Sequence, residues 1–407
     1  MTSSSSSNHI TPLDKRRVTA LLLVLIALVY TSQVIHIFRG GADGSSDFDV
    51  FYLVGQAFWR GEVSDAYRSL LRAASGDLHI GLRWTYPPPF AIILAPFGLI
   101  SEWMAYAIFM GAITVAYLYV LRAIDRESFS VSLMVATPAI VVSLASGQNG
   151  MLFAAILGLL GLGVTHNYHR VGIHLGLLAL KPQMLPAAAV SLLVLNRWRD
   201  LRAAAFCCVF LVATSIVAFG PSIWGDFSRT MAETKLILLE GRLPLFRMVS
   251  VYASMRSLGF SASVSLLAQA LSVVIALGAV VFTARRATPR QHIGVAIFAT
   301  TLISPYQYDY DLPCVGIALA FLWPTIMRGA TATERTICLA CISIATVWGL
   351  LQDLRLSLLF GDAAINHRME PWSISGPLLL LCFVIVLRVL FLTTGHTEAR
   401  AVRRVLE

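Results

Sequence analysis

The chain has 407 residues, of which 57% are apolar and only 13% are charged, and its formal net charge is +9. Soluble domains are nearer half apolar and a quarter charged, so this chain has too few polar side chains to cover a globule in water. The composition excludes a soluble enzyme, and it also excludes a disordered chain, which low hydrophobicity keeps unfolded. The basic residues are scattered over short loops rather than gathered on one domain, so no nucleic-acid partner is indicated.

Uncharged apolar stretches of sufficient length form helices in a membrane, because a backbone in lipid must satisfy its own hydrogen bonds. The first such stretch runs from Val18 to about Phe38, after a polar start that ends in Asp14-Lys15-Arg16-Arg17. Further spans are predicted at about 103–122, 130–146, 148–165, 170–181, 183–196, 201–219, 263–283, 291–304, 311–328, 335–352 and 375–394, with a short helix dipping in at 87–100. The prediction is an all-α polytopic transmembrane bundle of about 10–12 spans.

The distribution of basic residues predicts the orientation of this bundle. By the positive-inside rule, tails at 1–17 and 395–407 lie in the cytoplasm, around a single transmembrane domain at 18–394. The outer side then has the three longest loops, at about 40–86, 220–261 and 352–372, and the second contains amphipathic stretches that we expect to lie along the interface. Any chemistry that needs water is therefore expected on the outer side.

The first outer loop contains Asp47 and Asp49, directly before the aromatic-rich amphipathic segment FYLVGQAFW. A carboxylate held at a membrane surface can act as a general base on a hydroxyl substrate. The alternative is a helix N-cap at Ser46 or Asp47, because such residues precede an apolar-periodic run at many helix starts. The sequence leaves both interpretations open.

The end of the same loop reads Arg83-Trp84-Thr85-Tyr86, followed by three prolines. Tyr86 and Trp84 offer an aromatic wall for a sugar or a prenyl chain, and Arg83 could meet a phosphate. The alternatives are that the prolines only break the regular structure and that Arg83 only anchors the chain at the membrane interface.

Two further polar features interrupt apolar stretches. Gln148 and Asn149 stand in Ser146-Gly147-Gln148-Asn149-Gly150, where they either cap two helix ends or point into a wet cavity. Lys181, followed by Pro182 and Gln183, lies within an apolar run, where a charge is costly unless it snorkels to the interface or meets an anion such as a phosphate.

The segment from Ser304 to Asp311 contains Tyr306, Tyr308, Asp309 and Asp311. Tyrosines and carboxylates are side chains that sugar sites use, although an interfacial tyrosine belt would have the same composition. Two carboxylates without a third ligand do not predict a metal, and the six cysteines, all in or against apolar runs, indicate neither a disulfide framework nor a metal site. No nucleotide-binding motif is found, so we expect no cofactor.

Six motifs occur in order over about residues 18–325. They are Asp47-Phe48-x-x-Phe51-Tyr52, Gly61 with Ala66-Tyr67, Tyr86-Pro87-Pro88-Pro89-Phe90, Gly147-Gln148-Asn149, Gly176-Leu177-Leu178-Ala179-Leu180-Lys181-Pro182-Gln183, and Ser304-Pro305-Tyr306 through Tyr310-Asp311. Together they resemble glycosyltransferase family 87, polytopic enzymes of the GT-C type that include polyprenyl-phosphate-mannose-dependent mannosyltransferases.

The resemblance implies a bacterial-type cytoplasmic membrane, an extracytoplasmic active site, a polyprenyl-phosphate-linked sugar as donor, and a lipid or glycan as acceptor. It implies that Asp47 is the catalytic base, with Asp49 as the fallback. We expect Lys181 and Arg83 to bind the donor phosphate. The residues expected to bind sugar or acceptor are Tyr86, Gln148, Asn149, Gln183, Tyr306, Tyr308, Asp309 and Asp311.

The histidine that assists in some mannosyltransferases of this group has no counterpart between Tyr306 and Asp311. The resemblance therefore does not identify the acceptor. The rival function is a transporter or flippase of lipid-linked sugars, which would need acidic residues at mid-membrane along a path open to both sides. The main spatial expectation is that Asp47 and Lys181 converge beneath a vestibule on the outer side.

Overall fold

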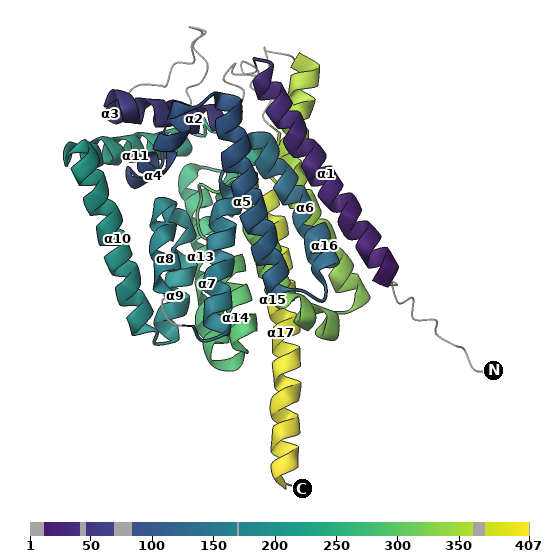
Figure 1. The fold of residues 1–407 in the computed structure, drawn as a ribbon. Coiled ribbons are helices and arrows are strands. Elements are labelled where there is room, and N and C mark those ends of the chain that lie inside the picture. The colour runs from purple at the N-terminus through teal and green to yellow at the C-terminus, as the bar shows by residue number, and fades with distance from the viewer. Residues whose placement is uncertain (1–11, 41–45, 69–83, 169–170, 361–370, 407) are drawn as a thin grey trace.

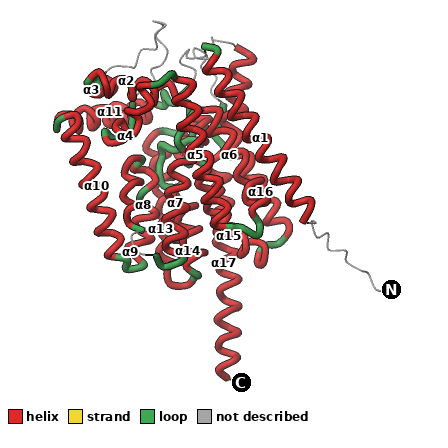
Figure 2. The backbone as a smooth tube through the Cα atoms, in the orientation of Figure 1, coloured by secondary structure: helices red, strands yellow, loops and turns green. Residues whose placement is uncertain are grey.

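The computed structural model describes residues 12–40, 46–68, 84–168, 171–360 and 371–406. Within these ranges the regular structure is helical (Figures 1 and 2), and the one extended pairing is an antiparallel bridge between Met248 and Tyr308. The all-α prediction is confirmed.

Eight stretches of the described chain are long and apolar enough to cross a membrane, which confirms the polytopic bundle. They correspond to α1 (Pro12–Phe38), α5 (Glu102–Ile124), α6 (Phe129–Ser146), α10 (Trp198–Phe219), α13 (Ala262–Arg286), α15 (Pro313–Gly329), α16 (Ala332–Phe360) and α17 (Ser375–Leu406). Helices α1 and α10 lie at the periphery of the bundle (Figure 1), and apolar side chains such as Phe206 and Val217 of α10 are exposed. These helices present the faces that lipid would cover.

Several helices inside the bundle are too short to cross it. Helices α7 (Gly150–Thr165), α9 (Pro186–Val194) and α14 (Pro289–Thr300) have 16, 9 and 12 residues. At 1.5 Å per residue they are about 24, 14 and 18 Å long, less than the ~30 Å hydrocarbon core. The connections at their inner ends therefore lie within the body of the protein.

The stretches predicted as spans at 170–181 and 183–196 form one re-entrant hairpin. Helix α8 (Gly172–Leu177) starts against the first turns of α10, where a Cβ on Gly172 would lie 1.8 Å from the carbonyl oxygen of Asp200. It rises along α10, reverses through the turns η2 (Leu178–Leu180) and η3 (Pro182–Met184), and returns as α9 to the start of α10. Lys181 stands at the tip of this hairpin.

A layer of mostly short helices covers one end of the bundle (Figure 1). It includes α2 (Asp47–Arg60), α3 (Val63–Arg68), α4 (Pro89–Leu94) and α11 (Ser222–Glu240). The turns η1 (Ala95–Leu99) and η4 (Leu245–Arg247) and helix α12 (Val251–Ser257) complete the helical elements apart from η5 (Asp309–Asp311). Helices α3 and α11 are joined by two hydrogen bonds of 3.0 Å from Arg68 to the buried carboxylate of Asp226.

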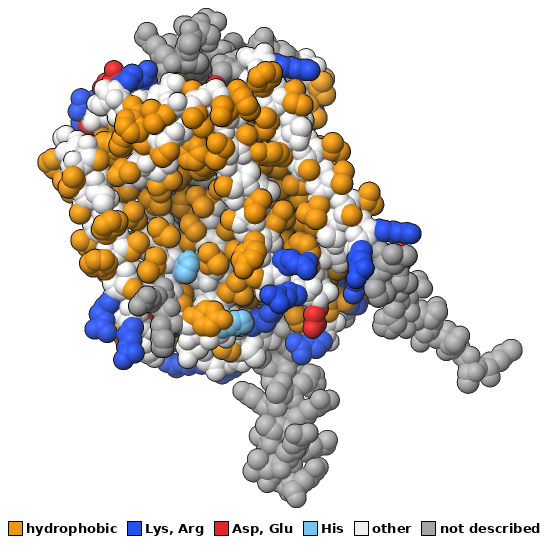
Figure 3. All heavy atoms as spheres, in the orientation of Figure 1, with side chains coloured by type: hydrophobic (Ala, Val, Ile, Leu, Met, Phe, Trp, Pro, Cys, Tyr) orange, Lys and Arg blue, Asp and Glu red, His pale blue; other side chains and the backbone are white. Residues whose placement is uncertain are grey.

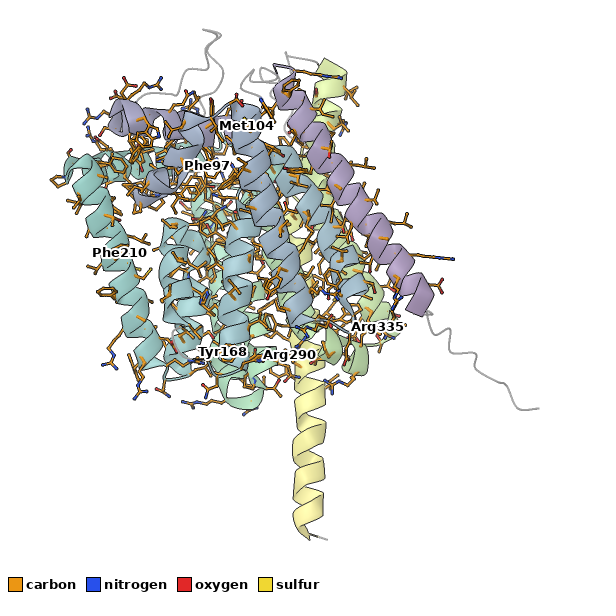
Figure 4. All side chains as sticks on the ribbon, in the orientation of Figure 1. Phe97, Met104, Tyr168, Phe210, Arg290 and Arg335 are labelled. Atoms are coloured by element: carbon orange, nitrogen blue, oxygen red, sulfur yellow. The ribbon has the colours of Figure 1, made fainter. Side chains whose placement is uncertain are left out.

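The two ends of the bundle differ in charge. Figure 3 shows Lys and Arg side chains gathered at the lower end, below a broad band of hydrophobic side chains. Helix α1 begins and α17 ends at this lower end (Figure 1), and Figure 4 places Arg290 and Arg335 there, whereas Phe97 and Met104 lie near the opposite end. The layer of short helices is thus at the end opposite the basic one.

Candidate functional site

Polar segments that are far apart in the chain meet beneath the layer of short helices. Gly147 adopts a left-handed conformation (φ +65°) and approaches the start of α2 so closely that a Cβ there would lie 2.6 Å from Ser46 Oγ. A Cβ on Gly150 would lie 1.8 Å from the carbonyl oxygen of Tyr310. We call the resulting group the polar cluster: Asp47, Tyr86, Ser146, Gln148, Asn149, Lys181, Arg247, Tyr306, Tyr308, Asp309, Tyr310 and Asp311.

Lys181 forms the buried floor of the polar cluster. Its side chain is 2% exposed and makes an ion pair with Asp311, whose side chain is equally buried. Its ammonium group also donates to Asn149 Oδ1 at 3.0 Å and lies 5.3 Å from the ring centroid of Tyr310. The lysine therefore does not snorkel to the interface; it meets a carboxylate of the protein itself.

A second ion pair joins Arg247 to Asp309. Arg247 Nη2 donates to Asp309 Oδ1 at 3.0 Å and to Ser146 Oγ at 2.7 Å, and Nε donates to Asp309 Oδ2 at 3.3 Å. Arg247 and Asp309 are the chain neighbours of Met248 and Tyr308, which form the antiparallel bridge. The bridge therefore holds the two ion-pair partners beside each other. Burial alone would lower the pKa of Arg247, but Asp309 outweighs it and holds this pKa above its ordinary value.

Helix α16 fits against this second pair through a glycine. A Cβ on Gly349 would lie 2.0 Å from Asp309 Oδ2 and 3.1 Å from Arg247 Cα. One turn further along α16, the exposed carboxylate of Asp353 lies 3.9 Å from Arg247 Nη1. At position 349 only glycine, which has no Cβ, leaves enough space for the carboxylate of Asp309.

Asp47 lies at the rim of the polar cluster and is half-buried. Ser46 is the N-cap of α2, with its Oγ accepting from the backbone N–H of Phe48 at 3.1 Å, so Asp47 is not needed as the cap. Burial raises the pKa of Asp47, while Arg247, a hydrogen bond with Gln148 and the more distant Lys181 oppose this shift. A carboxylate with a raised pKa is a stronger base than a free one.

Asp49 is directed to a different place. Two residues along a helix correspond to a rotation of about 200°, so Asp49 and Asp47 leave α2 on nearly opposite sides. Asp49 is 4% exposed, and its carboxyl group is hydrogen-bonded with that of Glu102 at the start of α5. The structure thus separates the fallback residue from the polar cluster.

Tyr86 and the two amides link Asp47 to Lys181. The hydroxyl of Tyr86 lies 3.1 Å from Gln148 Oε1 and 3.0 Å from Asn149 Oδ1, the same oxygen that accepts from Lys181. These contacts direct Asn149 Nδ2 away from both donors, and this buried atom has no hydrogen-bond partner among the described residues. An unpaired buried donor is costly, and at such a site a ligand oxygen would satisfy it.

Tyr306, Tyr308 and Tyr310 form one side of the polar cluster. The rings of Tyr308 and Tyr310 are stacked with centroids 5.2 Å apart, and those of Tyr306 and Tyr308 meet edge to face at 5.3 Å. Burial, together with Asp47, raises the pKa of Tyr306 to about 12. Tyr308 is only 8% exposed, which does not fit an interfacial tyrosine belt.

The remaining predicted residues are not joined to the polar cluster. Gln183 lies half-buried in η3, and no hydrogen bond among the described residues connects it to the cluster. Arg83 lies outside the described residues. In the described part of the chain, no three His, Cys, Asp or Glu side chains are grouped as metal ligands.

Arg247 was not predicted from the sequence. It stands in LPLFRMVS, where a single arginine next to apolar residues is also typical of an interfacial anchor. Its partner Asp309 is 62 residues away, and only the bridge between two loops brings them together. No short-range pattern could have shown this pairing.

The sequence model of glycosyltransferase family 87 matches residues 84–305, more than half of the chain. The chain belongs to glycosyltransferase family 87. Six members of the polar cluster lie within the matched region: Tyr86, Ser146, Gln148, Asn149, Lys181 and Arg247. No curated protein and no solved structure matches the chain. A family 87 protein is a membrane glycosyltransferase, so the polar cluster is its candidate active site.

Proposed function

We propose that this glycosyltransferase moves a hexose, with mannose as the first candidate, from a polyprenyl-phosphate-linked donor to a hydroxyl of a lipid or glycan. The observation that carries the proposal is the position of Asp47. The other two carboxylates of the polar cluster, Asp309 and Asp311, are paired with half-buried or buried cations, whereas Asp47 lies half-buried at the rim beside Gln148. Asp47 is thus the carboxylate best placed to receive a proton from a bound acceptor.

The proposed reaction is a single inverting displacement. The acceptor oxygen forms a bond to the anomeric carbon while its proton moves to Asp47, and the anomeric C–O bond to the phosphate breaks. The electron pair of that bond stays on the phosphate, which changes from a diester with one negative charge to a monoester with a further ionisable oxygen. A stable anionic leaving group needs no general acid, so a base and a cation suffice.

The rest of the polar cluster suits a sugar bound between base and leaving group. The tyrosine rings at 306, 308 and 310 provide stacking faces, and Asn149 Nδ2 provides an unused donor for a hydroxyl. Tyr86 fixes the orientation of that amide through Oδ1. Gln183, which makes no hydrogen bond to the cluster among the described residues, is the weaker of the proposed sugar contacts.

We place the active site on the outer side of a bacterial-type cytoplasmic membrane. The support is the charge difference between the two ends of the bundle, with Lys and Arg side chains gathered at the lower end (Figure 3). Basic residues favour the cytoplasmic side, and the polar cluster lies beneath the layer of helices at the other end (Figure 1). A lipid-linked donor would reach the cluster from the plane of the membrane. Burial of its prenyl chain gains little relative to lipid, so the membrane concentrates this donor more than the protein selects it.

The packing below the polar cluster favours transfer over transport. Helix α15 continues from Asp311 toward the basic end, and its residues from Pro313 to Leu322 are buried. Among the described residues, the buried side chains of this stretch do not line a path toward the basic end, which a flippase would need. The transporter is therefore the second candidate.

The test is transfer of a radiolabelled sugar. Purified protein is incubated with labelled polyprenyl-phosphate hexoses and a membrane lipid extract, and the label is followed into product. We expect Asp47→Asn to lower the rate by about 10²–10⁴, the usual contribution of one positioned base. The matched Asp49→Asn variant should retain far more activity, and equal losses in both variants would contradict the assignment of Asp47. Movement of intact donor across vesicle membranes without sugar transfer would favour the transporter.

A further inference from the structure

We propose that Arg247 is the residue that binds the donor phosphate, and that Asp309, Ser146 and Gly349 are positioning residues that hold its guanidinium group for this task. The proposal rests on the proposed function, because it assumes a lipid-phosphate donor. It changes the residue expected to meet the phosphate from Lys181 to an arginine in the loop between α11 and α12.

The hydrogen bonds of Arg247 leave one edge of its guanidinium group free. A guanidinium has five N–H groups in a planar fork. Nε and Nη2 are used by Asp309 and Ser146, whereas none of the hydrogen bonds among the described residues uses Nη1. The exposed carboxylate of Asp353 lies 3.9 Å from Nη1, beyond hydrogen-bond distance. Two N–H groups therefore remain for an incoming oxyanion.

Accessibility also favours Arg247 over Lys181. The side chain of Arg247 is 17% exposed, whereas that of Lys181 is 2% exposed and lies among the rings of Tyr86, Phe153 and Tyr310. Lys181 is paired directly with Asp311 and hydrogen-bonded to Asn149. A phosphate would have to displace buried partners to reach it, whereas Arg247 is more exposed and its Nη1 makes no hydrogen bond among the described residues.

The charges of the reaction fit this arrangement. As the acceptor hydroxyl gives its proton to Asp47, one negative charge leaves this carboxylate and one is added to the departing phosphate. Arg247 interacts electrostatically with Asp47, so it can respond to both changes. The sum of charges around it stays constant during the transfer, which avoids creating a new net charge in a half-buried site.

Fixing the guanidinium plane is the role of the positioning residues. Asp309 is 1% exposed and contacts two nitrogens of Arg247, and Ser146 holds Nη2 from the end of α6. Gly349 keeps the side of α16 open for the carboxylate of Asp309. A planar fork held at Nε and Nη2 presents Nη1 in one direction, which suits the directed recognition of a phosphate.

The test is equilibrium binding of polyprenyl phosphate, with the uncharged polyprenol of equal length as the second ligand. The protein is purified and reconstituted as the full chain. We expect wild type to prefer the phosphate, and Arg247→Ala to weaken phosphate binding by about 10- to 100-fold, the usual effect of losing a hydrogen bond to a charged group, with little change for polyprenol. Arg242→Ala is the matched control, because Arg242 is an exposed arginine in the same loop, and it should bind both ligands as wild type does.

Arg247→Ala leaves the buried carboxylate of Asp309 without its cation, so this variant could unfold. The double variant Arg247→Met with Asp309→Asn removes both charges together and should show the same selective loss of phosphate binding. Arg247→Lys keeps the charge but not the fork, and it should recover part of the affinity.

The possible results separate the two proposals. A preference for phosphate that persists in the folded double variant would overturn the role of Arg247 while leaving the donor class intact. An equal loss for both ligands would mean that Arg247 only supports the fold, and would also overturn it. If wild type binds phosphate and polyprenol alike, the lipid-phosphate donor is wrong and the role of Arg247 fails with it.

Discussion

Replacing Gly349 by alanine should disturb the active site from a helix that makes no predicted contact with substrate. The new Cβ would lie 2.0 Å from Asp309 Oδ2, whereas ordinary contacts begin at about 3.4 Å, so the carboxylate must move by about 1.4 Å. Its 3.0 Å hydrogen bond to Arg247 Nη2 cannot survive such a shift unless Arg247 moves with it. A misplacement of about 1 Å in a catalytic site can lower the rate about 10²-fold. We therefore expect kcat/KM to fall by about two orders of magnitude.

The assay is the initial rate of radiolabel transfer over a range of donor concentrations, with thermal unfolding measured on the same preparation. Gly278→Ala is the matched control, because this helical glycine of α13 is exposed and a Cβ there meets no atom within 4 Å. The control should keep wild-type activity, since alanine favours a helix over glycine. If Gly349→Ala retains activity within about threefold of the control, the positioning of Arg247 by Asp309 and α16 is wrong.

Three further predictions test other parts of the structure. Burial raises the pKa of Asp47, with Arg247 and Gln148 opposing, and the base must be unprotonated to act. We therefore expect kcat/KM to rise with pH through a midpoint above the pKa of a free aspartate. A value of kcat/KM that has already reached its plateau at the pKa of a free aspartate would contradict this. Arg290 Nη2 donates at 2.9 Å to the carbonyl of Ala320, which has no helical donor because the residue four positions on is Pro324. Arg290→Met should therefore lower the free energy of unfolding by about 1–3 kcal/mol. Arg285→Met, at an exposed arginine, is the control, and equal unfolding temperatures of the two variants would refute this role. Fluorescent and phosphatase reporters should place both termini in the cytoplasm, and termini on opposite sides would refute the topology.

Periodicity and length predict most of the fold. Long apolar runs such as 103–122 and 263–283 match α5 and α13 because a span in lipid needs about 20 residues and has no other way to satisfy its backbone. The stretches at 148–165 and 291–304, predicted as spans, form the shorter helices α7 and α14, and the hairpin at 172–194 departs further from the prediction. Its two arms are apolar and separated by Pro182, and apolarity alone does not distinguish two spans from one re-entrant pair. The position of Lys181 at the tip depends on packing against α10.

The same limit applies to the candidate site. Lys181, Asn149 and Asp311 are unusual enough in apolar surroundings to be noticed one by one, and the structure joins all three. Which carboxylate pairs with which cation depends on contacts across loops, and these have no local signature. Asp47 and Asp49 differ by two positions in the sequence, and only the helical rotation of α2 separates their surroundings.

The pairing of Lys181 with Asp311 has a consequence for biosynthesis. The two residues are 130 positions apart, so the ribosome makes the lysine long before its counter-ion exists. During that interval an ammonium group at the tip of an apolar hairpin must remain in contact with water or with a temporary partner such as a chaperone, since leaving it alone in hydrocarbon is costly. We therefore expect the hairpin tip to reach its buried position only after the segment containing Asp311 arrives, and chains truncated ahead of that segment should be preferred substrates of membrane quality-control proteases.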